Sequence, residues 1–301
     1  MERKIKIGTR GSELALWQAN YIADLIGRDR VEIVIIKTEG DKIQNVSFNK
    51  MEGKGFFTKE IEEALLDNSI DLAVHSLKDL PTEEVKGLKL AAIPVRGDFH
   101  DLLIMHRDCL DNSALGIKSG KKIGTSSMRR LAQLKAIDQS LIIEPLRGNV
   151  NTRLRKLKEG LYDAIVMAKA GVERINLDVS EFYVRELPEE LFLPAPAQGA
   201  LGLQIRYDDT YTEKIVEKLN DPVTEKAVKA ERSFLKYFGG GCHVPLGALA
   251  RLHGDAIILN GVVASPEGNF VARSRVYGKR PESLGEELAR ILKAKGADKY
   301  I

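Results

Sequence analysis

The sequence predicts an α/β protein with two lobes that contain mainly parallel sheets, followed by a smaller C-terminal α+β domain. Strand-like and helix-like segments alternate over residues 3–168, which is typical of the βα units that build parallel sheets. Proline and glycine interrupt this alternation at 93–98, and three prolines fall within 187–198. We interpret these two segments as hinge crossings, by which the chain leaves the first lobe and later returns to it.

The first lobe begins with residues 3–8, in which polar and apolar side chains alternate as they do in a strand. Ser12 is expected to cap a helix, because apolar residues then recur at helical spacing from Leu16 to Ile26. Further expected elements are a strand at 31–36, a helix at 58–66, a buried strand at 71–76 and, after the return crossing, a strand at 200–205.

The second lobe and the C-terminal domain are predicted in the same way. In the second lobe we expect strands at 121–124, 141–144 and 164–168, and helices at 127–137 and 150–158. The C-terminal domain is expected to hold helices at 223–237 and 283–294, with strands near 248–252, 256–264 and 270–276. The predicted domains are therefore residues 1–95 with 197–216, residues 100–190, and residues 219–301.

The composition excludes several classes of protein. The chain has 301 residues, of which 44% are hydrophobic and 30% charged, as in folded globular proteins. The longest stretch without a charge, Leu191 to Ile205, contains two prolines and is too short to span a membrane. Charges occupy the N-terminal segment where a signal peptide needs apolar residues, so we expect a cytoplasmic protein. A net charge of +3 is too small to indicate nucleic-acid binding.

Cys242 is the first candidate for a chemical role. It follows three consecutive glycines, which supply no side chain to cover the thiol. This context favours covalent attachment or a nucleophilic role over the buried, unreactive state that is usual for a free cysteine. Cys109 is expected to be such a buried cysteine. Because the chain has no CxxC pair, no metal site is predicted.

Asp79 is the second candidate, within the turn 75–81 that follows the predicted buried strand. In open α/β sheets the turns after the carboxyl ends of strands line the ligand crevice, which places Asp79 for catalysis. Aspartate before a Leu-Pro step is also ordinary turn chemistry, and Lys78 with Asp79 is equally consistent with a solvated ion pair. Position alone leaves both interpretations open.

Arginines cluster just after predicted strands. If the sheets are parallel, their guanidinium groups converge with hydroxyl groups and helix N-termini at one sheet edge, where they would bind several carboxylates or phosphates. One arginine in an early helical turn is usually a surface residue, but several at equivalent places predict a polyanionic ligand. No glycine-rich nucleotide-binding pattern follows a strand. The arginines are Arg10, Arg129, Arg130, Arg147, Arg153 and Arg174.

Seven motifs, in order along the chain, resemble the hydroxymethylbilane synthase (porphobilinogen deaminase) family. They lie within 9–19, 53–55, 75–81, 124–130, 146–150, 194–200 and 240–242. One departure is Ala197, where the family pattern usually has glycine. The resemblance implies two lobes like those of bacterial solute-binding proteins and a third domain that carries a cofactor.

The resemblance also implies a reaction. A dipyrromethane cofactor is attached to Cys242 through a thioether. Four porphobilinogen molecules are added to it head to tail, and each loses ammonia to give an azafulvene that the terminal pyrrole attacks. Hydrolysis then releases hydroxymethylbilane, a step of tetrapyrrole biosynthesis. By this resemblance Asp79 is the catalytic carboxylate and the enzyme is a monomer.

Binding roles follow from the same resemblance, since every pyrrole unit carries an acetate and a propionate that arginines can pair. Besides Cys242, the residues expected to bind the cofactor are Lys78, Thr125, Ser126, Ser127, Arg129, Arg130 and Arg153. The residues expected to bind substrate are Arg10, Ser12, Gln18, Lys54, Arg147 and Arg174.

Two other functions fit parts of the sequence. A two-lobed module that binds a small anion would explain the hinge crossings and the arginines, but it leaves Cys242 and Asp79 without a role. A nucleic-acid-binding protein would also use the arginines and would show strongly salt-dependent affinity for duplexes. The chain has no recognised nucleic-acid-binding motif, so neither nucleic acid nor a membrane is expected as a partner.

Overall fold

The computed structural model describes residues 3–38, 58–241 and 244–301. The chain divides into two compact units, Met1–Gly97 with Ala200–Glu225, and Asp98–Gly199 with Lys226–Ile301. The second unit thus holds both the second lobe and the C-terminal domain. The finer division into three domains, predicted above, stays a prediction.

The first unit is built on a five-stranded sheet with the order β2-β1-β3-β10-β4. Its strands are β1 (Ile5–Thr9), β2 (Val31–Ile35), β3 (Leu72–Ser76), β4 (Leu88–Ala92) and β10 (Leu201–Arg206). β1 pairs in parallel with β2 and β3, whereas β10 runs antiparallel to β3 and β4. The predicted return of the chain is confirmed, because β10 follows the second crossing and joins this first sheet.

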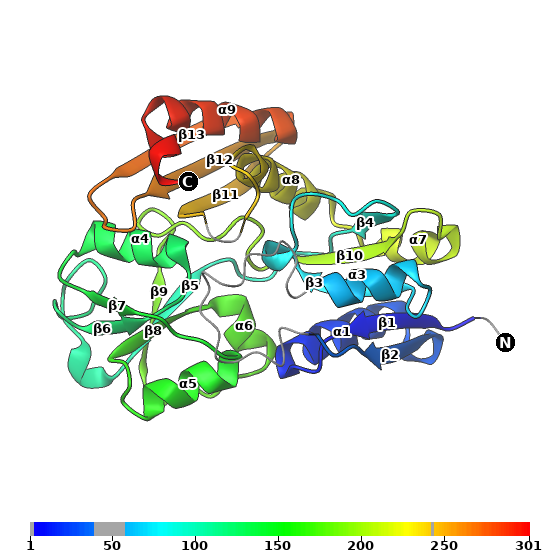
Figure 1. Cartoon of the computed structure of the whole chain (residues 1–301), viewed down its shortest axis with the longest axis horizontal. Coiled ribbons are helices and arrows are strands. Elements are labelled where there is room, and N and C mark those ends of the chain that lie inside the picture. Colours follow the sequence, from blue (N-terminus) through cyan, green and yellow to red (C-terminus); the bar gives the residue numbers. More distant parts are fainter. Residues whose placement is uncertain (1–2, 39–57, 242–243) are drawn as a thin grey trace. The chain divides into compact units, whose positions relative to one another are not determined.

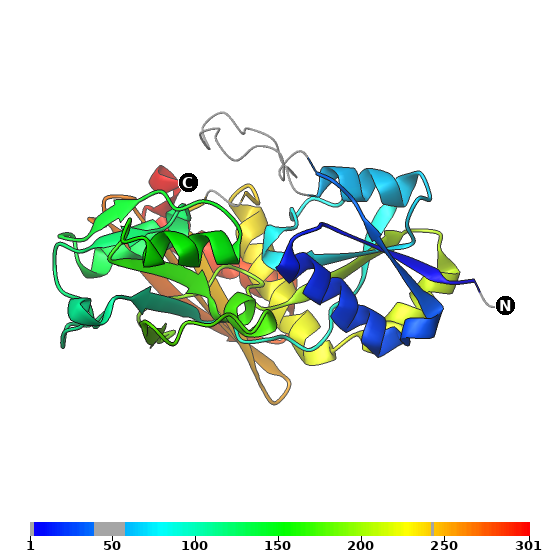
Figure 2. The ribbon, with the colours of Figure 1, turned by 90° about the horizontal axis from the view of Figure 1, so that it is seen from below.

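Helices cover both faces of the first sheet, and Figure 2 shows α1 and α3 on opposite sides of it. Leu72 and Val74 of β3 pack with Ile22 of α1, whereas Ala73 between them packs with Ile61 of α3. This alternation follows from the two-residue period of a strand, which points successive side chains to opposite faces. The helices are α1 (Glu13–Ile26), α3 (Lys59–Leu66) and α7 (Thr210–Val216), with 3₁₀ turns η1 (Arg28–Arg30), η3 (Leu77–Asp79) and η5 (Glu217–Leu219).

The second lobe repeats this plan with a sheet of order β7-β6-β8-β5-β9. β6 pairs in parallel with β7 and β8, and β5 runs antiparallel to β8 and β9. Both sheets are therefore mixed, with a parallel part at one side and antiparallel strands at the other. The strands are β5 (Asp101–Met105), β6 (Lys122–Gly124), β7 (Ile142–Glu144), β8 (Ala164–Ala168) and β9 (Tyr183–Leu187).

Two cores again sandwich the second sheet. Leu103 of β5 packs with Leu134 of α4, whereas the neighbouring Ile104 packs with Leu157 of α5 on the opposite face. Asn149 caps α5 by accepting a hydrogen bond from the Thr152 amide at 2.9 Å. The helices are α4 (Met128–Ile137), α5 (Val150–Lys158) and α6 (Lys169–Arg174), with the 3₁₀ turn η4 (Arg107–Cys109).

The C-terminal part is a three-stranded antiparallel sheet with the order β11-β12-β13. Two helices cover one face, as Figure 1 shows for α9, and α4 of the second lobe contacts β11 and β12. At Gly261 of β12 a Cβ would lie 2.6 Å from Leu288 of α9, so glycine permits the close approach of helix and sheet. The elements are α8 (Pro222–Tyr237), β11 (Leu246–His253), β12 (Ala256–Ala264), β13 (Val271–Gly278), α9 (Pro281–Ala294) and η6 (Ala297–Tyr300).

The predicted fold class is confirmed, except that both sheets are mixed rather than mainly parallel, because β10 and β5 run antiparallel to their neighbours. Every helix and strand expected above has a counterpart among the described residues. The strands β4, β5 and β9 and the short helices α6 and α7 were not predicted. Within the described parts of the chain, no helix combines the length and the apolar character needed to cross a membrane.

Candidate active site

In the first unit, the segments that follow β1 and β3 lie at one edge of the sheet. β1 and β3 are parallel neighbours, with Ile7 opposite Leu72. Arg10 and Ser12 follow β1, and the turn with Asp79 follows β3. Because parallel strands end at the same edge, the topology of this unit brings the segments that follow β1 and β3 to one edge of the sheet.

Asp79 ends the 3₁₀ turn η3, which continues directly from β3. Leu77 is fully buried and donates its amide to the Ala200 carbonyl at 3.0 Å, and Leu80 is buried on the other side. Asp79 itself is exposed, and no described residue forms a hydrogen bond or an ion pair with its carboxylate. The turn thus holds a carboxylate that remains available to accept N–H groups from a ligand.

Ser12 and Gln18 each form a hydrogen bond near the edge of the sheet at which β1 and β3 end. Ser12 is the N-cap of α1 and accepts a hydrogen bond from the Ala15 amide at 3.4 Å. Gln18 is buried and donates from Nε2 to Ser76 Oγ at 2.7 Å. Gln18 therefore joins α1 to the end of β3, the strand that leads into the turn with Asp79.

In the second lobe, three hydroxyl residues form the link between β6 and α4. Thr125 Oγ1 accepts from the Ser127 amide at 3.2 Å, and Ser127 Oγ accepts from the Arg130 amide at 3.4 Å as the N-cap of α4. Ser126 Oγ donates to the Leu146 carbonyl at 3.0 Å. The hydroxyl protons of Thr125 and Ser127 have no acceptor among the described residues, so both can donate to an anion.

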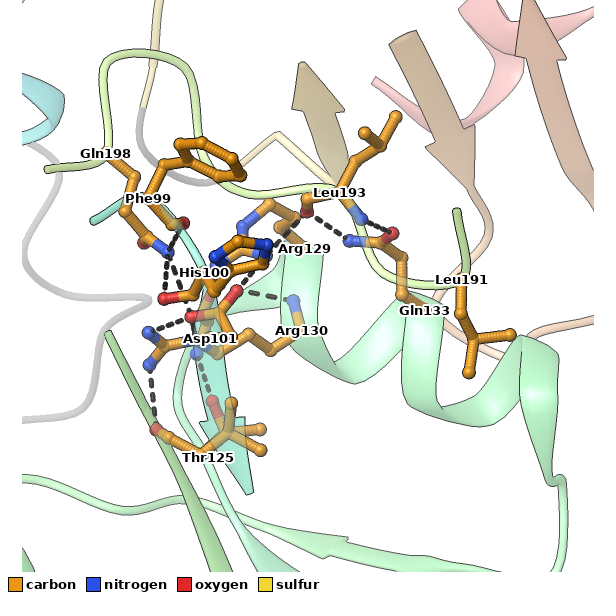
Figure 3. Close-up of polar contacts among 12 residues, drawn as sticks. Phe99, His100, Asp101, Thr125, Arg129, Arg130, Gln133, Leu191, Leu193 and Gln198 are labelled. Carbon is orange, nitrogen blue, oxygen red and sulfur yellow. Dashed lines mark hydrogen bonds and ion pairs between the residues drawn. The ribbon is translucent and has the colours of Figure 1, made fainter. Parts of the chain in front are cut away.

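Arg129 and Arg130 are buried in the first turn of α4 and share one buried partner, Asp101 (Figure 3). Arg129 Nη1 donates to Asp101 Oδ2 at 2.7 Å and to the Leu193 carbonyl at 2.8 Å. Arg130 Nη2 donates to Asp101 Oδ1 at 2.6 Å, and its Nη1 donates to the Val166 carbonyl at 2.9 Å. Burial lowers the pKa of Arg129, and the Asp101 carboxylate opposes that shift.

The arginine pair is suited to a further carboxylate. The Nε of Arg129 is buried without a hydrogen-bond acceptor among the described residues. Two guanidinium groups face the single carboxylate of Asp101, so these three side chains together carry one excess positive charge. A buried excess charge is unfavourable unless it is paired, so these residues fit a ligand with carboxylate groups.

Three other arginines of the second lobe are only partly buried. Arg153 Nε donates to the Gly148 carbonyl at 2.8 Å. Gly148 has a φ of +112°, and a Cβ there would lie 2.5 Å from Thr152, so the loop that carries Arg147 requires glycine. Arg174 Nη2 donates to the Gly199 carbonyl at 2.6 Å. Arg147 follows β7 and Arg174 ends α6 after β8, as predicted.

Two predicted site residues, Cys242 and Lys54, lie outside the described residues. The other cysteine, Cys109, is 1% exposed, and its thiol lies 3.7 Å from Asp108 Oδ1 and 3.8 Å from Asp163 Oδ1. Burial raises the pKa of the Cys109 thiol, the nearby Lys121 opposes this shift, and the two carboxylates add to it, so the pKa is raised. The expectation that Cys109 is a buried cysteine is confirmed, and this environment disfavours the thiolate needed for a nucleophile.

Ala197, the position where the family pattern usually has glycine, adopts a left-handed conformation with a φ of +62°. Its amide donates to Glu231 Oε2 at 2.6 Å, and both residues are fully buried. Gly199, two positions later, has a φ of +87°. The second crossing thus keeps a backbone conformation that suits glycine even though alanine occupies it.

Sequence reasoning missed Asp101, the partner of the arginine pair. The available signal was a charged residue at the start of an uninterrupted apolar strand, Asp101–Met105, whose five residues are all buried. A charge next to such a run is expected to be paired, but the sequence does not identify its partners.

Two family models match this chain. Residues 5–214 match the family model described as porphobilinogen deaminase, dipyromethane cofactor binding domain. Residues 225–294 match the model described as porphobilinogen deaminase, C-terminal domain. Together the two models cover most of the chain.

Curated relatives are similar over nearly the whole length. Porphobilinogen deaminase from Maridesulfovibrio salexigens is 45% identical, covering 99% of this chain and 97% of the relative. Porphobilinogen deaminase from Natranaerobius thermophilus is 43% identical, covering 99% of this chain and 98% of the relative.

Among solved structures, an ancestral cationic amino acid solute-binding protein is 14% identical, covers 72% of this chain and 87% of its own, and has a TM-score of 0.44. The two-lobed architecture is established by the sheet order rather than by this likeness. From the two family models and the full-length relatives, we conclude that the chain is an enzyme of the porphobilinogen deaminase family, which has a dipyrromethane cofactor.

Proposed function

We propose that this enzyme condenses four porphobilinogen molecules head to tail and releases hydroxymethylbilane. Each condensation joins an aminomethyl carbon to a pyrrole α-carbon with loss of one ammonia, and one water molecule releases the finished chain. The structural observation that carries the proposal is the Asp79 carboxylate, which is exposed and unpaired among the described residues at the sheet edge shared with Arg10. The names of the full-length relatives support the choice of substrate.

The dipyrromethane group, when bound, supplies the free pyrrole α-position from which the chain grows. We propose that Cys242 holds it through a thioether, because the three glycines before Cys242 supply no side chain to cover the thiol. Cys109 is a poor alternative, since its thiol is buried beside two carboxylates and its pKa is raised. The proposed attachment residue lies in the part of the chain that matches the C-terminal family domain.

Asp79 is the proposed catalytic residue. An ionised carboxylate can accept hydrogen bonds from pyrrole N–H groups and stabilise the positive charge that develops as ammonia leaves. It can also hold the proton that leaves the pyrrole α-carbon when the new bond forms. Lys78, in the same turn, would place a positive charge near ligand carboxylates.

The remaining proposed roles concern the acetate and propionate groups of the pyrroles. Charge-assisted hydrogen bonds to arginine, often bidentate, hold such groups most strongly. We propose Arg129, Arg130 and Arg153 for the cofactor, with the hydroxyl groups of Thr125, Ser126 and Ser127. The proposed substrate contacts are Arg10, Ser12, Gln18, Lys54, Arg147 and Arg174. We further propose a cytoplasmic monomer that uses no metal and no nucleic acid.

Mass spectrometry of the purified chain tests this function. The intact mass should exceed the sequence mass by two linked pyrrole units, and peptide mapping should place them on Cys242. Cys242→Ser should lack this addition after incubation with porphobilinogen, whereas the control Cys109→Ser should retain it. Pyrroles retained by Cys242→Ser would refute the attachment. A wild-type chain that stays unmodified and turns over no porphobilinogen would instead support a binding module.

A further inference from the structure

A single buried carboxylate organises the arginine pair of the second lobe. Asp101 is the first residue of β5, and its side chain has no exposed surface. Its Oδ2 accepts from Arg129 at 2.7 Å, and its Oδ1 accepts from Arg130 Nη2 at 2.6 Å and Nε at 3.1 Å. The two guanidinium groups thus bind different oxygens of one carboxylate, which fixes their orientation relative to each other (Figure 3).

This orientation is not what the helix alone would produce. Arg129 and Arg130 are consecutive residues of α4, so their side chains leave the helix axis about 100° apart. Both are nonetheless about 95% buried, at 4% and 5% exposure, against the same group. Without Asp101 the two buried cations would repel each other and lose an acceptor, so neither would keep its place.

Asp101 also contacts the end of the second crossing. Gln198 is fully buried, and its Nε2 donates to Asp101 Oδ1 at 3.1 Å and to the Phe99 carbonyl at 2.8 Å. Gln133 of α4 exchanges two hydrogen bonds of 2.9 Å with the backbone of Leu193, earlier in the same crossing. One carboxylate therefore joins the arginine pair to the segment in which the chain returns toward the first sheet.

We propose that Asp101 is a positioning residue, which holds Arg129 and Arg130 in the geometry that pairs with ligand carboxylates and ties that geometry to the crossing at Gln198. It acts through the arginines and contacts no substrate itself. The part of this inference that concerns ligand binding rests on the proposed function. The part that concerns the placement of the arginines rests on the contacts alone.

The test compares Asp101→Asn with Asp71→Asn in the full chain. Asp71 is a matched control, because it is also buried and accepts from Arg206 at 2.8 Å and from the Lys6 amide at 3.0 Å, but it lies in the first unit. The first measurement is the rate at which phenylglyoxal modifies Arg129 and Arg130, read by peptide mapping. The second is the fraction of chains that carry two pyrrole units after incubation with porphobilinogen, together with kcat and KM.

We expect Asp101→Asn to raise the modification rate of both arginines at least fivefold, to lower the loaded fraction at least fivefold and to raise KM in the chains that do load. Asp71→Asn should stay within twofold of wild type in all three. Wild-type modification rates in Asp101→Asn, or equal changes in both variants, would overturn the proposal.

A second variant, Asp101→Glu, is used if Asp101→Asn does not fold. It keeps the charge but displaces the carboxylate oxygens, so the modification rates, the loaded fraction and KM should each change twofold to fivefold. Wild-type values for Asp101→Glu would overturn the proposal.

The same experiment separates this proposal from the proposed function. If the wild-type chain acquires no pyrroles, the proposed function fails, and the arginine modification rates still decide whether Asp101 positions the pair. If the wild-type chain is loaded and Asp101→Asn is loaded equally well, the proposed function stands and the role of Asp101 in ligand binding is wrong.

Discussion

Asp79 and Asp101 show two opposite ways in which a fold can place a carboxylate. Asp101 is buried, and its carboxylate accepts hydrogen bonds from Arg129, Arg130 and Gln198. Asp79 is exposed and has no described polar partner, and the buried Leu77 and Leu80 on either side hold its turn. A carboxylate that is placed by its neighbours, rather than by its own contacts, keeps its full capacity to bind a ligand.

Replacing Asp79 tests this interpretation at the level of one side chain. Asp79→Asn should lower kcat about 10²–10⁴-fold, because the amide cannot stabilise positive charge or hold a proton. Stability should change by less than about 0.5 kcal/mol, since the side chain is exposed and forms no hydrogen bond or ion pair with a described residue. Steady-state assays and thermal unfolding measure both quantities. Glu84→Gln, an exposed acid on the same connection, is the control, and a similar loss in both variants would contradict a specific role.

Arg147 offers a second test among single residues. Arg147→Leu removes a proposed carboxylate partner, and a charge-assisted hydrogen bond contributes about 1.5–3 kcal/mol. We therefore expect a KM for porphobilinogen that is about 10- to 100-fold higher, or assembly that stops at an intermediate length. Arg155→Leu, an exposed arginine on the helix that follows, is the matched control and should leave KM unchanged. Normal kinetics of Arg147→Leu would exclude a substrate contact.

The second crossing shows how an element can retain a conformation that its residue type does not favour. Ala197 has a positive φ within a buried segment, and its amide is held by the Glu231 carboxylate of α8. Glu231 Oε1 also accepts from the Ala250 amide of β11 at 2.8 Å. The surrounding hydrogen bonds therefore hold the backbone at Ala197 in place. A left-handed conformation that is strained for alanine persists only when its surroundings hold it in this way.

Ala197→Gly should consequently be nearly neutral or stabilising. The left-handed conformation costs an alanine about 1–2 kcal/mol, and removal of the buried methyl group forfeits only about 0.8 kcal/mol. Ala230→Gly, equally buried but within helix α8, should destabilise by about 2 kcal/mol, because the helix-propensity loss adds to the lost methyl group. Denaturant unfolding of both variants measures the difference, and equal destabilisation would show that Ala197 is unstrained.

At the scale of the whole molecule, stability should depend on pH through partly buried carboxylates such as Asp98. Asp98, the last residue of the first crossing, accepts from the His100 amide at 2.8 Å and pairs with Lys169 at 2.7 Å. Burial raises the pKa of Asp98, but the hydrogen bonds from Lys169 and His100 outweigh it and leave the pKa below its ordinary value. Hydrogen bonds to the carboxylates of Asp98 and Glu186 raise the pKa of Lys169.

A carboxyl group whose pKa is lowered by folding stabilises the protein above the pKa of the unfolded state, near 3.9. That contribution should be lost as the pH falls through the lower pKa of the folded state. Asp98→Asn should therefore reduce the free energy of unfolding by about 1–3 kcal/mol at neutral pH, with a smaller additional loss on acidification. Unfolding titrations between about pH 2 and pH 7 measure this. Asp24→Asn, an exposed control, should change little, and parallel pH profiles for wild type and Asp98→Asn would contradict the prediction.

The sequence predicted the βα units well because local signals mark them. The Ser12 and Ser127 caps, the buried run at Leu72–Ser76 and the apolar period of the helices all act over a few residues. β5 was missed because both of its faces are covered, so Asp101–Met105 shows no alternation. β4 and β9 mix charged and apolar residues without a clear period, and only pairing with β10 and β5 makes them strands.

The sequence by itself determined which reactive side chains stand directly after strands, and its motifs identified the family. The tertiary structure alone decided that Arg129 and Arg130 are buried on Asp101, that Gln18 binds Ser76 and that Ala197 keeps a left-handed backbone. The reason is physical, because strand ends and helix caps depend on neighbouring residues. The contact of Arg129 with Asp101 joins positions 28 residues apart, and that of Gln18 with Ser76 joins positions 58 residues apart. Such pairs form only when the sheets bring distant segments together and remove them from water, where an unpaired charge or amide is unfavourable.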